Sequence, residues 1–288
     1  MNHASKAFCI LMLLVAAACS QPASSRGPNT PSPSPPPTTS DQLVLKVETG
    51  GGFVPAELLL AEVPTFALYA DGRLITQGPQ ILIFPGPALP NLIERRVSPE
   101  GVAAISEAAR RAGLASGNKH LPLETVADAP TTTFTFVENG TRHVVTAYAL
   151  GMEDEDMNVP PADREARKAL AGLRERLSGL ESWLPPGSLG EEFPYDFKEL
   201  RMFVRAGAPS PGPGLEQPPA EWPLPRPLSD FGAPTGRLEL RCGAVTGEDL
   251  RILSERVRRA TELTPWVSAG TTYSVVFRPL LPDESGCP

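Results

Sequence analysis

Hydrophobic residues alternate with polar ones along two segments, and a turn signal interrupts each segment. "FALYADGRLITQG" has an extended run on either side of Asp71-Gly72, and "TTTFTFVENGTRHVVTAYAL" has one on either side of Asn139-Gly140. Alternation is typical of half-buried strands, and Asp-Gly or Asn-Gly between two such runs is typical of a type I′ turn. We therefore predict two β-hairpins, and a further extended segment at "QILIF", residues 80–84.

A helical period follows each hairpin. Ser98 and Pro99 have the residue types of an N-cap and a first helical position, and Gly113 is a stop signal. Between them, and again over residues 162–184, apolar residues recur at spacings of three and four, which predicts a helix with one buried face. These positions are Val102, Ile105, Ala109 and Ala112 in the first helix, and Leu170, Leu173, Leu177, Leu180 and Leu184 in the second.

The rest of the chain continues with short elements on both sides of a Pro/Gly-rich stretch. Thr246 and Asp249 resemble a capping box, with Asp in place of the usual Glu or Gln. We expect an α+β fold, with duplicated β-hairpin–helix units and an antiparallel sheet over residues 42–190, and a C-terminal β-α-β unit over residues 191–288. The later elements predicted are strands at 200–204, 237–242 and 271–278 and a helix at 248–260.

The N-terminal apolar run, Ala7 to Ala18, is too short to span a bilayer, which takes roughly 20 residues. It has the length of a signal-peptide core. Ala16-Ala17-Ala18-Cys19 resembles the bacterial lipobox, in which small residues precede a cysteine whose thiol accepts the lipid. We predict that residues 1–18 are a lipoprotein signal peptide and that Cys19 is acylated. An ordinary secretory signal with an incidental cysteine is the alternative.

Residues 19–41 are rich in Pro, Ser and Thr and hold almost no apolar side chain, which predicts an extended tether. Together with the acylated cysteine, the tether predicts a lipid-anchored protein on the extracytoplasmic side of the cell membrane. The chain has 33 acidic and 26 basic residues, a balance that argues against nucleic acid as a partner.

The cysteines that remain after Cys9 and Cys19 are Cys242 and Cys287. In an exported protein, two remaining cysteines are most simply a disulfide, and we predict that bond.

Three longer stretches carry a resemblance to known proteins. "LYADGRLITQG", "RRVSPEGVAAISEAARRAGL" and "DAPTTTFTFVENGTRHVV" resemble a hairpin–helix module of bacterial envelope proteins. The tail "ELTPWVSAGTTYSVVFRPLLPDESGC" is similar to the end of a group of actinobacterial lipoproteins. The resemblance covers most of residues 42–288. It implies a fold and a compartment, and it transfers no catalytic residue.

Motifs for catalysis are absent or incomplete. The chain has no GxSxG motif, and Ser116-Gly-Asn-Lys119 matches the SxxK of penicillin-binding enzymes without the companion motifs. His120 and His143 fall in different predicted elements, and no HExxH pair exists, so we predict no metal site and no cofactor. "EDED", residues 153–156, is predicted to be a solvated acidic loop, and Asp128 to cap a turn.

A binding surface is the remaining possibility. "TPWVSAGTTY" places Trp266 and Tyr273 among small residues, and both residue types are favoured at interfaces. The alternative is that Trp266 closes the core behind the last helix. We predict a non-catalytic binding or accessory module whose partner is an envelope protein or a glycan. A cell-envelope hydrolase acting on peptidoglycan or another envelope polymer is the alternative.

Overall fold

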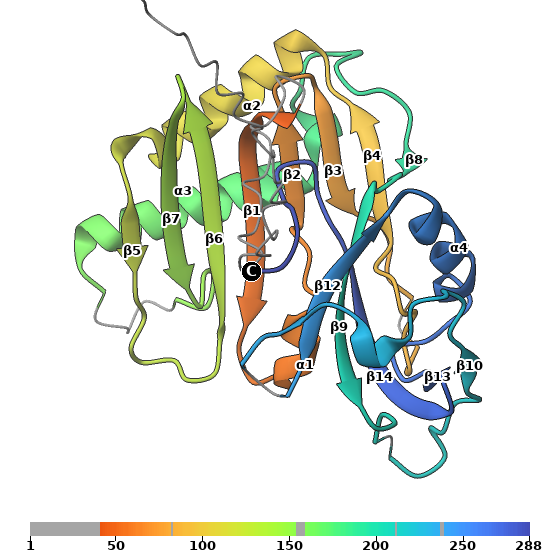
Figure 1. The fold of residues 1–288 in the computed structure, drawn as a ribbon. Helices are drawn as coiled ribbons and strands as arrows, with labels where there is room; N and C mark the ends of the chain where they lie inside the picture. The colour runs from red at the N-terminus through yellow and green to blue at the C-terminus, as the bar shows by residue number, and fades with distance from the viewer. Residues whose placement is uncertain (1–40, 82, 154–158, 211, 237–238) are drawn as a thin grey trace, which may run out of the picture. The chain divides into compact units, whose positions relative to one another are not determined.

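The computed structural model describes residues 41–81, 83–153, 159–210, 212–236 and 239–288. Within this part the chain is a mixed α+β protein with two sheets and four α-helices, which confirms the predicted class (Figure 1). The described residues form one compact unit. The signal peptide, Cys19 and the tether as far as residue 40 lie outside the described residues.

The first sheet has eight strands in the order β5-β7-β6-β1-β2-β3-β4-β8. All neighbouring pairs are antiparallel except β5 and β7, which run parallel. The strands are β1 (Leu43–Gly51), β2 (Phe66–Tyr69), β3 (Arg73–Gln77), β4 (Leu92–Arg96), β5 (Lys119–Leu121), β6 (Pro130–Glu138), β7 (Thr141–Tyr148) and β8 (Phe193–Pro194). A four-residue helix, α1 (Ala56–Leu59), lies between β1 and β2 in the chain.

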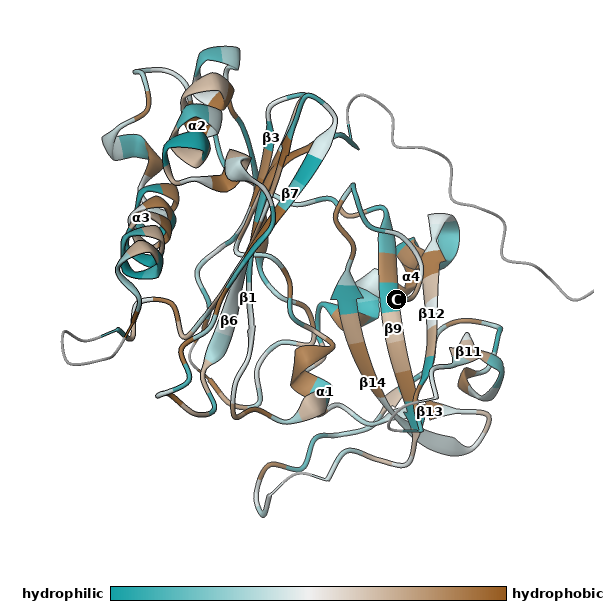
Figure 2. Ribbon diagram, turned by 90° about the vertical axis from the view of Figure 1, so that its left-hand side faces the viewer, coloured by the Kyte–Doolittle hydropathy of each residue, from teal (hydrophilic) through white to brown (hydrophobic). Residues whose placement is uncertain are grey.

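Two helices, α2 (Pro99–Arg111) and α3 (Pro161–Ser178), cover one face of this sheet (Figure 2). The Ser98 hydroxyl accepts a hydrogen bond from the Gly101 N–H at 3.2 Å, which confirms the predicted cap. The core beneath the helices combines the predicted helical apolar positions with alternate strand residues, namely Leu45, Val47, Phe66, Leu68, Phe134, Phe136, Ile105, Ala109, Leu170, Leu173 and Leu177.

The second sheet has six strands in the order β10-β13-β14-β9-β12-β11. Both β12 and β14 pair antiparallel with β9, so the β12–helix–β14 segment passes over a strand that lies between its two ends. The elements are β9 (Glu199–Ala206), β10 (Ala220–Glu221), β11 (Ala233–Pro234), β12 (Arg241–Thr246), α4 (Gly247–Val257), β13 (Trp266–Ser268) and β14 (Thr271–Pro279).

One hydrophobic core is shared by the two sheets. Ala67, Tyr69 and Ile75 from the first sheet belong to the same cluster as Met202 and Phe277 from the second. Leu250, Leu253 and Val257 of α4 complete this cluster. The second sheet therefore covers the part of the remaining face that β1, β2, β3 and β4 form, whereas β5, β7 and β6 extend to one side of it (Figure 1). Figure 2 shows the second sheet on the side opposite α2 and α3.

The hairpin predictions succeed, with one difference in turn type. Asn139 and Gly140 have φ values of 49° and 75°, so both adopt the positive φ that a type I′ turn needs. Between β2 and β3 only Gly72 has a positive φ, 82°, and its N–H bonds to the Tyr69 carbonyl at 3.0 Å. Asp71 does not adopt a positive φ, so the predicted type I′ geometry is wrong there.

The predicted strand at residues 80–84 is wrong. The described residues of this segment are irregular, and Pro79, Pro85 and Pro87 surround it. Proline supplies no N–H to a strand ladder, so an apolar run enclosed by prolines cannot extend a sheet interior. The strand in this region is β4, which begins at Leu92.

Two predictions for the C-terminal part also differ from the structure. The strand expected at 237–242 is β12, which begins at Arg241, and residues 237–238 lie outside the described part. Thr246 is the N-cap of α4, but its side chain makes no capping hydrogen bond, so the proposed capping box does not form.

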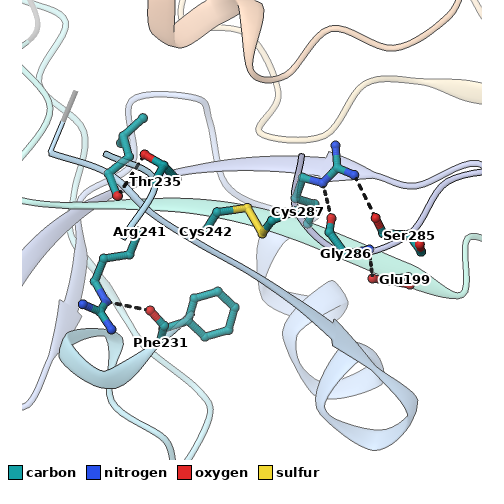
Figure 3. The surroundings of a disulfide bond; sticks show 10 residues. Glu199, Phe231, Thr235, Arg241, Cys242, Ser285, Gly286 and Cys287 are labelled. Carbon is teal, nitrogen blue, oxygen red and sulfur yellow. Dashed lines mark hydrogen bonds between the residues drawn. A yellow bond between two sulfur atoms is a disulfide. The ribbon is translucent and has the colours of Figure 1, made fainter. Parts of the chain in front are cut away.

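The predicted disulfide is present between Cys242 on β12 and Cys287, with a Cα–Cα separation of 6.0 Å (Figure 3). Close by, the Gly286 N–H donates to the Glu199 carboxylate at 2.9 Å, and the Arg201 guanidinium donates to the Gly286 carbonyl. The bond therefore fastens the C-terminal tail, residues 280–288, to β12 of the second sheet.

We expect Cys287→Ser to lower the free energy of unfolding by about 4 kcal/mol, because the bond closes a loop between residues 45 positions apart. Urea denaturation of the variant and of the wild-type chain measures this difference. Adding reductant to the wild-type chain should reproduce the loss. Two alkylatable thiols at positions 242 and 287 in the unreduced chain would contradict the assignment.

Candidate functional site

The residues considered for catalysis do not converge. The His120 Nδ1 lies 2.8 Å from the Thr146 hydroxyl, on the strand next to its own. His143 lies three positions from Thr146 on β7, and the alternation of side chains along a strand puts it on the opposite face. The two histidine side chains therefore lie on opposite faces of the sheet.

The SxxK match has no helical geometry. Ser116 ends a short 3-10 turn, Leu114–Ser116, and Lys119 begins β5. The Lys119 ammonium forms an ion pair with Asp163 at 3.0 Å. Within the described ranges, no group of three or more His, Cys, Asp or Glu residues is placed to hold a metal ion.

The acidic run is described only at Glu153, since Asp154–Asp156 lie outside the described residues. The Glu153 carboxylate pairs with the Arg167 guanidinium, whose side chain is 1% exposed. Arg167 also donates to the backbone carbonyls of Leu121 at 2.9 Å and Tyr148 at 2.6 Å. Glu153 is therefore part of a structural link from α3 to the ends of two strands, which differs from the solvated loop predicted. Asp128, predicted to cap a turn, has a positive φ of 53°.

Trp266 and Tyr273 do not form the predicted surface. Trp266 is 1% exposed and Tyr273 is 8% exposed, and both belong to the core shared by the sheets. The Trp266 ring meets the rings of Trp222 and Phe277 edge to face, at 5.9 and 5.5 Å between centroids. The indole closes the core behind α4, which is the alternative raised from the sequence.

A buried charge cluster lies where the C-terminal tail crosses the first sheet. The Lys46 ammonium on β1 is 2.6 Å from the Asp283 carboxylate and 3.5 Å from the Glu284 carboxylate. The Glu284 carboxylate also receives two hydrogen bonds from the Arg278 guanidinium, at 2.7 and 2.9 Å. The Tyr69 hydroxyl donates to the other Asp283 oxygen at 2.7 Å. Each buried charge in this cluster thus faces an opposite charge.

Electrostatics in the cluster follow from burial and pairing. Burial would raise the pKa of Glu284, but the hydrogen bonds from Arg278 and the charge of Lys46 outweigh it and lower that pKa to about 2. Burial, reinforced by Asp283, raises the pKa of Tyr69 far above its usual value. Burial also raises the pKa of Tyr195, whose hydroxyl donates to the Leu280 carbonyl at 2.9 Å. Glu284, Tyr69 and Tyr195 therefore each keep one protonation state, which suits a structural role rather than acid–base chemistry.

Next to this cluster is a polar cleft of about 410 Å³. Its lining includes two carboxylates, Glu48 and Glu62, together with Arg201 and Arg278. Burial raises the pKa of Glu62, and a hydrogen bond from the Gly51 backbone opposes that rise. The cleft therefore gathers titratable groups around a cavity, and it supplies two carboxylates that the hydrolase alternative would need.

A second cavity, which we call the apolar groove, has a volume of about 450 Å³. β14 and β9 contribute Ser274, Val276 and Arg205 to its lining. Its walls are α1 and the connection between β3 and β4, which contribute Leu58 and Phe84. A concave, largely apolar lining with a few polar groups is typical of a ligand site.

Three charged residues, Glu57, Arg205 and Glu262, line the groove. The Arg205 guanidinium pairs with the Glu57 carboxylate at 2.7 Å, and both side chains are 36% exposed. The Glu262 carboxylate accepts a hydrogen bond from the Gly86 N–H at 2.9 Å, which holds the β3–β4 connection in place. Each of these charged side chains therefore has a partner within the protein, and most of the other lining residues are apolar.

Exposed hydrophobic side chains surround the groove. Eight large hydrophobic residues are exposed in the described part of the chain, and six of them belong to the β1–α1 segment or to the β3–β4 connection. We call this set the apolar end. Its members are Phe53 (89% exposed), Val54 (44%), Leu58 (47%), Ile81 (72%), Ile83 (61%) and Phe84 (61%).

Sequence reasoning missed both the groove and the apolar end. Prolines around "QILIF" were the available signal, since they argue against a strand and leave the apolar residues without a sheet to cover them. The charge cluster gave no local signal, because Tyr69 and Asp283 are 214 positions apart.

Comparison with known proteins yields no relative: no family model matches the chain, and no curated protein or solved structure matches it. None of the helices in the described part of the chain combines the length and the apolar character that a membrane crossing requires.

We expect Glu284→Gln to lower the free energy of unfolding by about 3 kcal/mol at pH 7, because it leaves the buried Arg278 guanidinium without its carboxylate and removes the second carboxylate near Lys46. The folded pKa of Glu284 is about 2, below the ordinary value, so its contribution is complete above about pH 5 and is lost as the pH falls toward 2. The difference between variant and wild type should shrink over that range. Denaturant titrations at several pH values measure it.

The matched control is Glu248→Gln, which removes an exposed carboxylate paired with Arg251. We expect it to leave the denaturation midpoint almost unchanged, because water screens this exposed pair. Equal losses for the two variants, or a Glu284→Gln difference that is independent of pH, would contradict the assignment.

Proposed function

We propose that this chain is a lipid-anchored protein of the bacterial cell envelope whose folded part is a non-catalytic binding module. The resemblance to envelope lipoproteins and the lipobox at Cys19 support the location. In this proposal the two hairpin–helix segments, β2–β3 with α2 and β6–β7 with α3, are copies of one unit.

The observation that carries the binding role is the apolar groove with its exposed apolar surroundings. Contiguous exposed hydrophobic surface is costly to maintain in water, and in native proteins it marks sites that contact something else. Leu58 and Phe84 are 47% and 61% exposed although both line a cavity of about 450 Å³. A binding role accounts for this arrangement, whereas a purely structural role leaves it without a reason.

The second candidate function is hydrolysis of an envelope polymer in the polar cleft. The feature in its favour is Glu62, which has a raised pKa and shares the cleft with Glu48. Turnover of peptidoglycan fragments by the purified chain, lost in Glu62→Gln, would replace the binding proposal with this one.

Lipidation is tested by Cys19→Ala in cells fed an alkyne fatty acid. The variant should lose the label completely, because the thiol that accepts the lipid is gone. Cys9→Ala is the matched control and should label normally, since residue 9 belongs to the predicted signal peptide. Label retained in Cys19→Ala, or lost equally in both variants, would contradict acylation at Cys19.

Binding in the groove is tested with the dye 8-anilinonaphthalene-1-sulfonate, whose emission rises in apolar sites. We expect Ser274→Phe to weaken dye binding at least fivefold, because Ser274 lines the groove and the larger side chain would fill it. Thr272→Phe, two residues earlier on β14 and outside the groove lining, should leave it unchanged.

Fluorescence titration measures the binding, and circular dichroism checks that both variants are folded. Unchanged dye binding by folded Ser274→Phe would show that the groove is not the site.

A further inference from the structure

The apolar end gathers at one end of the first sheet for a topological reason. Both β1 and β3 pair antiparallel with β2, so β1 and β3 run in the same direction and finish at the same end (Figure 1). The chain leaves β1 into the segment that holds Phe53 and Val54, and it leaves β3 into the connection that holds Ile81, Ile83 and Phe84. Leu58 and Phe84 then line the same groove, which brings the two segments together.

The two segments lack charge. "GGGFVPA", residues 50–56, and "GPQILIFPGPALPN", residues 78–91, contain no Asp, Glu, Lys or Arg. A surface that recognises a charged macromolecule presents complementary charges, and these segments offer none. The chemistry of the apolar end therefore fits an occupant that is recognised by apolar contact alone.

The backbone of residues 78–91 has fewer free N–H groups than an ordinary loop of this length, which lowers the cost of removing it from water. Four of its residues, Pro79, Pro85, Pro87 and Pro90, have no N–H to desolvate. The Gly86 N–H is satisfied by Glu262, and the Ala88 N–H donates to the Ala260 carbonyl at 3.0 Å. In the shorter segment, the Phe53 N–H donates to the Asp128 carbonyl at 3.2 Å. These prolines and hydrogen bonds reduce the number of backbone groups that lose water when the surface is covered by lipid.

We infer that the apolar end docks into the interfacial region of a lipid bilayer, with Phe53, Ile81, Ile83 and Phe84 as the inserted side chains. This rests on the proposed function in one respect, because the lipid at Cys19 would keep a bilayer within reach. Amphipathic helices that lie in this region bury their apolar faces by about 5–10 Å, at the headgroup boundary and not in the hydrocarbon centre, and we expect the same depth for these side chains.

The chain between the anchor and the fold is long enough for this docking. Asp41 lies 22 positions after Cys19, and a chain of that length spans at most about 75 Å. The nine residues of β1 separate Asp41 from the apolar end by about 30 Å. The domain can therefore turn its apolar end to the membrane that holds its lipid, and the tether raises the local concentration of that surface.

The test uses the processed chain, residues 19–288, with Cys19→Ser so that no lipid is attached. We expect it to co-sediment with vesicles of pure phosphatidylcholine. Adding phosphatidylglycerol, or raising the salt from about 50 to 500 mM, should change binding by less than twofold, because the apolar end carries no charge to be screened. Phe53→Ser combined with Phe84→Ser should weaken partitioning at least tenfold.

The matched control is Phe193→Ser, which removes an exposed phenylalanine (59% exposed) on β8, outside the apolar end. It should bind vesicles like the parent chain. Any of three results would overturn the inference: no binding by the parent, an equal loss in Phe193→Ser, or binding only to anionic vesicles at low salt.

Sedimentation velocity of the same chains tests the competing occupant, a second copy. A concentration-dependent dimer that the double variant abolishes, without vesicle binding by the parent, would assign the apolar end to self-association and overturn the inference. Because these chains carry no lipid, a negative result leaves acylation at Cys19 untouched. Failure of Cys19 labelling in cells would likewise leave the vesicle result standing.

Discussion

Burial of the Lys46 ammonium is the constraint on which much of this fold depends. A charge removed from water needs an opposite charge in close contact, and leaving it alone costs several kcal/mol. Lys46 finds its partners, Asp283 and Glu284, in the C-terminal tail. The tail must therefore return from the second sheet to β1 of the first. Its path fixes Arg278 and Tyr69 around the same carboxylates and leads to the disulfide at Cys287.

The buried charge cluster lies beside the middle of β1, and the apolar end begins just after the chain leaves that strand. Lys46 and Glu48 lie in the middle of β1, beside the paired charges and the polar cleft, whereas the chain beyond Gly51 enters the uncharged segment with Phe53. Ion pairs, hydrogen bonds of tyrosine hydroxyls and a disulfide hold the chain around the buried charge cluster. Exposed apolar side chains are concentrated at the apolar end. The apolar end can therefore stay exposed to water, because the contacts that stabilise the fold lie in another part of the structure.

Local patterns predicted the parts of the fold that depend on near neighbours. Asn139-Gly140 specified its turn, Ser98 specified a cap, and the leucines of α3 specified a buried face, because each signal acts within a few residues. "QILIF" was misread since an apolar run alone does not distinguish a strand from an exposed loop, and the prolines that decide it stand outside the run. The order of strands in the two sheets has no comparable local signal.

Of the candidate site residues in the described part of the chain, the disulfide pair could be foreseen, and it followed from cysteine count and compartment rather than from geometry. The sequence left Trp266 open between a surface and the core, because an aromatic residue among small ones has the same local pattern in both places. The groove combines α1, the β3–β4 connection, β9 and β14, which are distant in sequence. Its existence depends on how those elements pack, so no single stretch of sequence encodes it.

The buried charge cluster also limits how early during synthesis this protein can finish folding. The Tyr69 hydroxyl and the Asp283 carboxylate that receives it are separated by 214 positions, and Lys46 waits for the same carboxylate. A chain made from its N-terminus onward cannot neutralise Lys46 until almost its last residues have left the ribosome. Until then the face of the first sheet around Tyr69 lacks the C-terminal part of its cover. For the exported protein that we propose, this order keeps the core shared by the two sheets from closing before the whole chain is available.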